Sequence, residues 1–154
     1  MASTIQPGIY WIQNIATGTV LDLSNGSPDK NTKVQAWQKR ELHDYWVSAQ
    51  LWIVTSVGEN TYVFQNANSR TYAELGGGDN QTPIVANAGT GGKNQQWVVT
   101  RNKNGTSYVI QNVQYNTFVD LYNGGNANGT AVNGWQGSGP ATENTNQLWN
   151  FVRA

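Results

Sequence analysis

The chain has no cysteine and few charged residues, and both absences exclude classes of function. Without cysteine there is no disulfide framework and no thiol chemistry. Charged residues make up 12% of the 154 residues, about half the usual share. Nine basic residues balance nine acidic ones, so the net charge is zero. The basic surface that typically binds nucleic acid is therefore missing.

Long apolar runs are missing as well. No stretch has the length and apolarity of a membrane-spanning helix. The first eight residues, Met1–Gly8, are polar and lack the apolar core of a secretory signal. These features predict no membrane insertion and favour a cytoplasmic location.

The sequence offers little material for catalysis. His43 is the one histidine, so a Ser-His-Asp device would depend on it, and clusters of histidine and cysteine around a metal are excluded by counting. A glycosidase needs two carboxylates roughly 5 to 10 Å apart, and no acidic pair has a spacing that recommends it. The sequence therefore predicts a protein that is not an enzyme and that needs neither a cofactor nor a metal.

What the chain does have is a threefold internal repeat. Each copy opens with Tyr-x-x-Gln-Asn, at residues 10–14, 62–66 and 108–112. Each then carries an acidic residue between apolar neighbours and closes on Gln-x-Trp. The acids are Asp22, Glu74 and Asp120, and the closing motifs are Gln50-Leu51-Trp52, Gln95-Gln96-Trp97 and Gln147-Leu148-Trp149. The copies span approximately residues 8–57, 58–104 and 105–154, and such a repeat constrains the architecture.

Short runs of β-branched and aromatic residues between Asn- and Gly-rich turns predict an all-β fold. Only the segment 38–48 leaves room for a short helical turn. Three repeats of about four strands must close on one another to remove their sheet edges, and propellers need four to eight blades. We therefore expect a single β-trefoil domain over residues 1–154. The tryptophans of the three Gln-x-Trp motifs should form its shared core.

Three Gln-x-Trp motifs in register, each with an upstream acid, resemble the ricin B-type (R-type) lectins, whose fold is the β-trefoil. The third copy, at residues 117–124 and 129–137, is similar to the galactose-binding agglutinins of mushrooms. This resemblance covers essentially the whole chain. It implies a non-catalytic lectin that binds glycans ending in galactose or N-acetylgalactosamine, with a role in fungal defence. It leaves open whether the protein forms a homodimer.

The resemblance also implies one sugar pocket in each copy. The acid would accept hydrogen bonds from vicinal hydroxyls, because a carboxylate has several acceptor positions and forms charge-assisted bonds. A downstream aromatic ring would stack on the C–H face of the sugar, and a polar residue beside Gln-x-Trp would complete the hydrogen bonding.

The three copies differ in how completely they match this pattern. The third matches fully, with Asp120, Asn123, Gly124, Gly134, Trp135, Asn146 and Gln147. The first has Asp22, Asn25, Trp37 and Gln50, but Ala49 replaces the polar neighbour, and its loop offers Lys39, Arg40, His43 and Trp46 as substitutes. The second has Glu74 and Asn94, but Asn87 stands in place of the tryptophan. We expect working sites in the third and first copies and not in the second.

A β-trefoil protease inhibitor that acts through one exposed loop is the alternative. Fold alone does not decide between the two functions. Inhibitors of this fold need no paired acid and tryptophan in register, so the aligned pairs favour the lectin.

Overall fold

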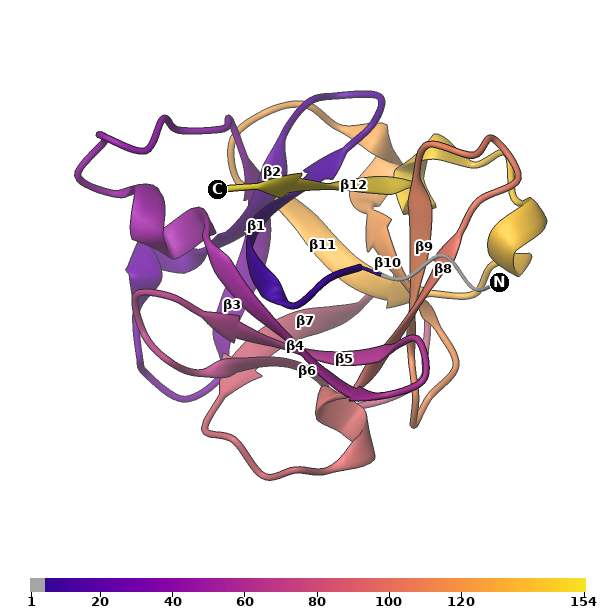
Figure 1. Cartoon of the computed structure of the whole chain (residues 1–154), viewed down its shortest axis with the longest axis horizontal. Coiled ribbons are helices and arrows are strands. Elements are labelled where there is room, and N and C mark those ends of the chain that lie inside the picture. The colour runs from indigo at the N-terminus through magenta and orange to yellow at the C-terminus, as the bar shows by residue number, and fades with distance from the viewer. Residues whose placement is uncertain (1–4) are drawn as a thin grey trace.

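The computed structural model describes residues 5–154, and this range is all-β, with twelve strands and no α-helix (Figure 1). The strands are β1 (Gly8–Asn14), β2 (Val20–Leu23), β3 (Thr32–Trp37), β4 (Trp52–Gly58), β5 (Thr61–Asn66), β6 (Tyr72–Leu75), β7 (Thr82–Asn87), β8 (Trp97–Arg101), β9 (Tyr108–Asn112), β10 (Phe118–Leu121), β11 (Thr130–Trp135) and β12 (Trp149–Arg153). Short 3₁₀ turns interrupt the loops: η1 (Ser24–Gly26), η2 (Val47–Gln50), η3 (Lys93–Gln95), η4 (Tyr122–Gly124), η5 (Gly139–Ala141) and η6 (Thr145–Gln147). The helical turn expected within residues 38–48 begins only at its end, as η2.

Six of the strands close into a barrel. Each pairs antiparallel with two others, in the cyclic order β1, β12, β9, β8, β5, β4 and back to β1. Every repeat contributes two of these strands, so no single repeat completes the barrel. Closure pairs the edges that an open sheet would expose.

The other six strands form three hairpins, one from each repeat. These are β2–β3, β6–β7 and β10–β11. The second strands of the hairpins also pair with one another, β3 with β7, β7 with β11 and β11 with β3. A six-stranded barrel joined to a triangle of hairpins is the β-trefoil, which confirms the predicted fold. The longer loops of the three repeats project in three different directions (Figure 1).

The core contains side chains from all twelve strands. At its centre lie Trp52, Trp97 and Trp149, with exposed fractions of 1%, 1% and 0%, as expected from the repeat. Each indole Nε1 donates a hydrogen bond to the backbone carbonyl just before the acid of its own repeat. The three acceptors are Leu21, Ala73 and Val119, at 3.0, 3.2 and 3.0 Å. The core tryptophans thereby fix the strands that carry the acids.

The asparagine that ends each opening motif shapes the rim of the neighbouring repeat. Asn66 Nδ2 donates to the Ala49 carbonyl and Asn112 Nδ2 to the Asn94 carbonyl, both at 3.0 Å. The Oδ1 atom of Asn66 accepts hydrogen bonds from the backbone N–H groups two and three residues further on, an Asx turn. Asn66 and Asn112 thus hold the residue that precedes Gln-x-Trp in the previous repeat, whereas Asn14 Nδ2 donates to the Thr145 carbonyl at 2.9 Å.

Candidate functional site

In all three repeats the glutamine of the Gln-x-Trp motif hydrogen-bonds to the acidic side chain from the protein interior. The glutamine Nε2 donates to a carboxylate oxygen and to a loop carbonyl, and the glutamine itself is buried. The carboxylate bonds are Gln50 to Asp22 at 3.1 Å, Gln95 to Glu74 at 2.9 Å and Gln147 to Asp120 at 2.9 Å. Gln50 and Gln147 are thus placed to orient the acids from the protein interior.

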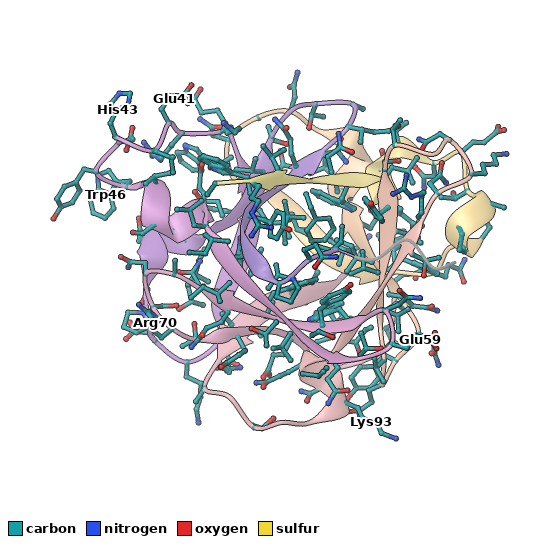
Figure 2. All side chains as sticks on the ribbon, viewed as in Figure 1. Glu41, His43, Trp46, Glu59, Arg70 and Lys93 are labelled. Atoms are coloured by element: carbon teal, nitrogen blue, oxygen red, sulfur yellow. The ribbon has the colours of Figure 1, made fainter. Side chains whose placement is uncertain are left out.

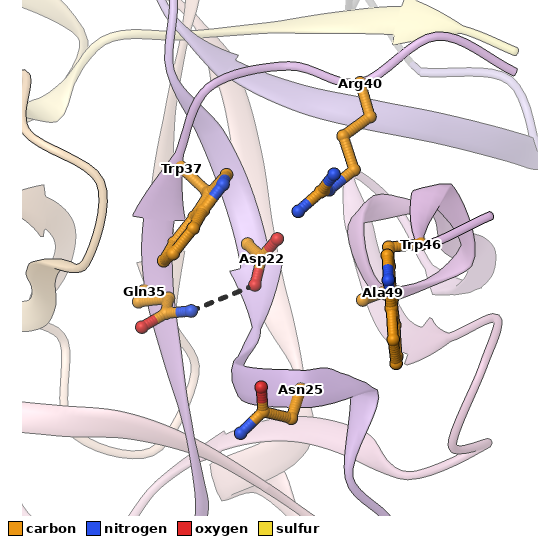
Figure 3. Close-up of a pocket in the computed structure, with 7 residues that line it drawn as sticks. All are labelled: Asp22, Asn25, Gln35, Trp37, Arg40, Trp46 and Ala49. Atoms are coloured by element: carbon orange, nitrogen blue, oxygen red, sulfur yellow. Dashed lines mark hydrogen bonds between the residues drawn. The ribbon is translucent and has the colours of Figure 1, made fainter. Parts of the chain in front are cut away.

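The first repeat forms a cavity of about 200 Å³ around Asp22 (Figure 3). Asp22 lies on β2 with 6% of its surface exposed. Gln35, opposite it on β3, donates from Nε2 to Asp22 Oδ1 at 3.1 Å. The lining residues are Asp22, Asn25, Gln35, Trp37, Arg40, Trp46 and Ala49. Of the residues predicted for this copy, the structure therefore brings Asp22, Asn25 and Trp37 together around one cavity.

Two indoles face this cavity from opposite sides. Trp37 ends β3 and is half-buried, whereas Trp46 comes from the following loop. Figure 3 shows Asp22 between the two rings, with the guanidinium of Arg40 directed towards it. The cavity therefore combines apolar walls with charged groups, which is the usual character of a small-molecule site.

The electrostatics of Asp22 balance opposing effects. Burial raises the pKa of its carboxyl above the ordinary 3.8, while hydrogen bonds from Gln35 and Gln50 and the charge of Arg40 act to lower it. Burial dominates because water no longer solvates the charge. The donors that oppose it favour the ionised carboxylate, which is the form that accepts hydrogen bonds most strongly.

In the second repeat, the polar side chains predicted for the site form hydrogen bonds within the protein. Glu74 Oε1 accepts from Gln95, and Glu74 Oε2 accepts from Asn87 Nδ2 at 2.9 Å. Asn87 is also bound to Asn31 of the first repeat, at 2.7 Å through its Oδ1 and at 2.8 Å through its Nδ2. Asn94 Nδ2 donates to the Leu75 carbonyl at 3.3 Å. Asn87, which replaces the tryptophan, therefore takes up one oxygen of the Glu74 carboxylate as a hydrogen-bond donor.

In the third repeat, the carboxylate accepts fewer hydrogen bonds from the protein than in the other two. Asp120 lies on β10 with 5% of its surface exposed, and Gln147 alone donates to it among the described residues. The residue opposite Asp120 on β11 is Asn133, one methylene shorter than its counterpart Gln35, and it makes no hydrogen bond to Asp120. Burial raises the pKa of Asp120, with the Gln147 hydrogen bond opposing. Oδ1 is thus left without a protein donor in residues 5–154.

The predicted partners Trp135, Asn123, Gly124 and Asn146 lie around this carboxylate strand. Trp135 ends β11 half-buried, and its ring is tilted against Tyr122 with centroids 6.4 Å apart. Asn123 and Gly124 follow β10 in the turn η4, both with positive φ, 51° and 63°. A Cβ on Gly124 would lie 2.8 Å from Asn146 Oδ1. The glycine therefore lets the Asn146 amide lie against this turn.

Gly134, also predicted for the third site, lies on the interior side of its hairpin. It is buried, and a Cβ on it would lie 2.8 Å from Thr117 Oγ1 and 2.9 Å from Leu75 Cδ1. Successive residues of a strand point to opposite faces, so Gly134 faces the interior while Asn133 and Trp135 face the other way. The absence of a side chain at Gly134 allows this close packing between repeats, and a ligand contact through its backbone stays a prediction.

Sequence reasoning missed Gln35, which both lines the first cavity and holds Asp22. A signal for it was present, because Gln35 stands two residues before Trp37 and therefore lies on the same face of the strand. Tyr122, packed against Trp135, was also missed. It lies in a turn whose geometry the strand pattern does not predict.

Three further observations within residues 5–154 concern metal ligands, membrane spans and the histidine. No group of three or more histidine, cysteine, aspartate or glutamate side chains gathers there as a metal site would require. No described helix is long and apolar enough to cross a membrane. His43 is exposed, on the loop that projects from the first repeat (Figure 2).

Comparison with solved structures agrees with the fold. The lectin of Polyporus squamosus, bound to a human-type influenza-binding epitope, is 34% identical with a TM-score of 0.76 over 97% of this chain, which spans 50% of that chain. The Rhizoctonia solani agglutinin is 22% identical with a TM-score of 0.82, covering 100% of both chains. The Macrolepiota procera ricin B-like lectin, solved with lactose, is 23% identical with a TM-score of 0.77, covering 99% of this chain and 100% of that one. At such low identity the last two show the fold alone.

Curated protein sequences give no significant match. The family model described as "Ricin-type beta-trefoil lectin domain-like" matches residues 48–135. That match covers more than half of the 154 residues, and the chain therefore belongs to the family of ricin-type β-trefoil lectin-like domains.

Proposed function

We propose that the protein binds glycans ending in galactose or N-acetylgalactosamine, through its first and third repeats, and leaves them chemically unchanged. One observation carries the proposal. A buried carboxylate and a half-buried indole occur together at equivalent positions of two repeats, Asp22 with Trp37 and Asp120 with Trp135.

Each part of this pair has a physical task. The carboxylate accepts hydrogen bonds from two neighbouring hydroxyls of the sugar, with the buried glutamine fixing its orientation. The axial 4-hydroxyl of galactose leaves a contiguous C–H patch on one face of the ring, and the indole stacks on that patch. An epimer that leaves buried polar groups unpaired is rejected, because unmade hydrogen bonds are costly.

The solved relatives support this class of ligand. The Macrolepiota lectin was solved with lactose, and the epitope bound by the Polyporus lectin contains galactose, written as Neu5Aca2-6Galb1-4GlcNAc. The proposal includes no catalytic step, because the three repeat acids do not belong to one site. Each acid lies in its own repeat, held by its own glutamine, whereas glycoside hydrolysis needs two carboxylates within roughly 10 Å.

The direct test is titration of the purified protein with galactose, lactose and N-acetylgalactosamine by calorimetry, with glucose and mannose as controls. Each site should bind with a Kd on the order of millimolar to high micromolar, because a monosaccharide offers few contacts. Absence of binding to all three galactosides, together with strong inhibition of a protease, would replace the lectin by the inhibitor.

A further inference from the structure

The loop after Trp37 is longer than its counterpart in the second repeat and differs from that of the third in its side chains. From the end of the hairpin to the closing glutamine, the chain advances 13 positions in the first repeat (37 to 50), 8 in the second (87 to 95) and 12 in the third (135 to 147). The first-repeat loop, residues 38–46, also holds the large exposed side chains Leu42, Tyr45 and Trp46. It projects outward in Figure 2, where His43 and Trp46 mark it.

This loop is held in shape by its own polar contacts. Arg40 Nη1 lies 3.3 Å from Asp44 Oδ2, and Asp44 Oδ1 accepts a hydrogen bond from the backbone N–H of Trp46 at 2.8 Å. At its base, the Arg40 backbone N–H donates to Gln50 Oε1 at 2.8 Å. Lys39 Nζ lies 3.9 Å from the centre of the Trp11 ring. These contacts place Trp46 relative to Asp22 before any ligand arrives.

Trp46 occupies the side of the cavity where the first repeat lacks an amide. Ala49 stands where the third repeat has Asn146, and Trp46 and Ala49 line the cavity together, opposite Trp37 (Figure 3). Trp46 keeps 52% of its residue surface exposed. A large, half-exposed indole that lines a polar cavity is apolar surface available to a ligand.

The corresponding loop of the third repeat is anchored elsewhere. The Pro140 carbonyl accepts hydrogen bonds from Asn102 Nδ2 at 2.7 Å and from the Lys103 backbone N–H at 3.0 Å. Residues 136–146 contain no aromatic side chain. The third repeat therefore offers Trp135 as a platform but no indole opposite it.

On the basis of the function proposed above, we propose that Trp46 is a specificity-determining residue of the first repeat. It forms a second aromatic wall, so that one terminal sugar residue is enclosed between Trp37 and Trp46, whereas the third repeat covers only one side. The cavity of about 200 Å³ is smaller than the roughly 300 to 1,000 Å³ of drug-sized pockets, which suits a single ring. N-Acetylgalactosamine is the sharper probe, because its acetamido methyl group adds apolar surface for the second wall.

The test isolates the first repeat by placing Asp120→Ala in all variants. In that background, Trp46→Ala should weaken binding of N-acetylgalactosamine by about threefold to tenfold, taking aromatic contact energies as the guide. Trp46→Phe should retain most of the affinity. The matched control is Leu42→Ala on the same loop, a residue 58% exposed and outside the cavity lining, which should bind as the background does. Calorimetry gives the affinities, and thermal melts confirm that each variant is folded.

An NMR titration provides a second readout. The indole Nε1–H signals of Trp37 and Trp46, assigned from their phenylalanine variants, should both shift as N-acetylgalactosamine is added. A shift of the Trp37 signal alone would overturn the proposal that Trp46 forms a second wall, and so would equal affinity of Trp46→Ala and the background. Neither result would contradict the proposed lectin function. Loss of all binding in the Asp120→Ala background also overturns it, because the first repeat then has no working site. Failure of the unmodified protein to bind any galactoside overturns the proposed function itself.

Discussion

At the scale of single residues, the molecule uses one amino acid for two unrelated purposes. Trp149 is fully buried in the core and donates to the Val119 carbonyl, whereas Trp135 is half-buried at the end of a hairpin strand. The two tryptophans lie only fourteen positions apart, yet one stabilises the barrel and the other borders the candidate site. Substitution should therefore separate stability from binding.

Trp149→Ala should destabilise the protein by about 3 to 5 kcal/mol, because it opens a large cavity in a core that all three repeats share. Trp135→Ala should change the melting temperature much less. It should weaken galactoside binding at the third repeat by about 1 to 2 kcal/mol. Thermal melts and sugar titrations of the two variants, run side by side, measure both effects. A Trp135→Ala protein that unfolds, or that keeps full binding at the third repeat, would remove that ring from the site.

The buried carboxyl of Asp120 predicts a pH dependence with a definite sign. Burial raises its pKa in the folded protein above the ordinary 3.8, so the folded state holds the proton more tightly than the unfolded state. The resulting stabilisation is complete below 3.8 and is lost as the pH rises through the raised pKa. Asp120→Asn removes this ionisation. We expect the variant to gain stability relative to the parent at neutral pH, and this gain to shrink towards zero as the solution is acidified.

Urea unfolding at a series of pH values gives the difference in unfolding free energy between the two proteins. A gain for Asp120→Asn that grows on acidification would contradict the assignment. Sugar binding should respond in the opposite sense, because the ionised carboxylate is the stronger acceptor. Binding at the third repeat should therefore weaken as the pH falls through the raised pKa, and the Asn variant should bind poorly throughout.

At the scale of elements, the hairpins and the loops between them differ in how far sequence alone predicts them. The repeat of acid and Gln-x-Trp predicted the trefoil, because three copies with one core position each leave few ways to close a barrel. Strand alternation could also have identified Gln35 beside Asp22 and predicted that position 134 faces the interior. These are local consequences of the two-residue period.

Contacts between distant segments and the paths of irregular loops were beyond such reasoning. Asn87, which hydrogen-bonds to Glu74, is itself hydrogen-bonded to Asn31 of the first repeat. The path of residues 38–46 depends on the Arg40–Asp44 contact within a loop that has no periodic pattern. The placement of Trp46 opposite Trp37 follows from that path, and so it becomes visible only in the structure.

The second hairpin provides an element-scale prediction. Both Glu74 oxygens already accept amide donors from within the protein, and a ligand would have to displace Asn87 to reach them. Glu74→Gln should therefore leave the affinity and the number of bound galactosides unchanged, whereas Asp120→Asn should reduce the number by one. Calorimetric stoichiometry decides between these outcomes. A loss of one binding site in Glu74→Gln would mean that the second repeat is a working site.

At the scale of the whole molecule, the proposed function predicts that the threefold arrangement lets one chain bridge two sugars. The repeats point their loops in different directions around the barrel (Figure 1), so we expect sugars bound at the first and third repeats to belong to different branches of a glycan surface or to different cells. Individually weak sites can then give strong attachment, because the second contact forms at a high effective concentration. This bridging needs two working sites in each assembly, whether a monomer or an oligomer.

Single-site variants test the bridging directly. If the protein is a monomer with two working repeats, Asp22→Ala and Asp120→Ala should each abolish agglutination of galactose-bearing cells while each retains one sugar site by calorimetry. Glu74→Ala is the matched control and should agglutinate as the parent does. Light scattering gives the mass of every variant. The mass is needed because a dimer would keep two sites after either substitution.

Agglutination that survives both single substitutions in a monomeric protein would require a third site. It would contradict the assignment of working sites to the first and third repeats alone. Agglutination lost only with Asp120→Ala would assign all binding to the third repeat, and bridging by the parent would then depend on a dimer.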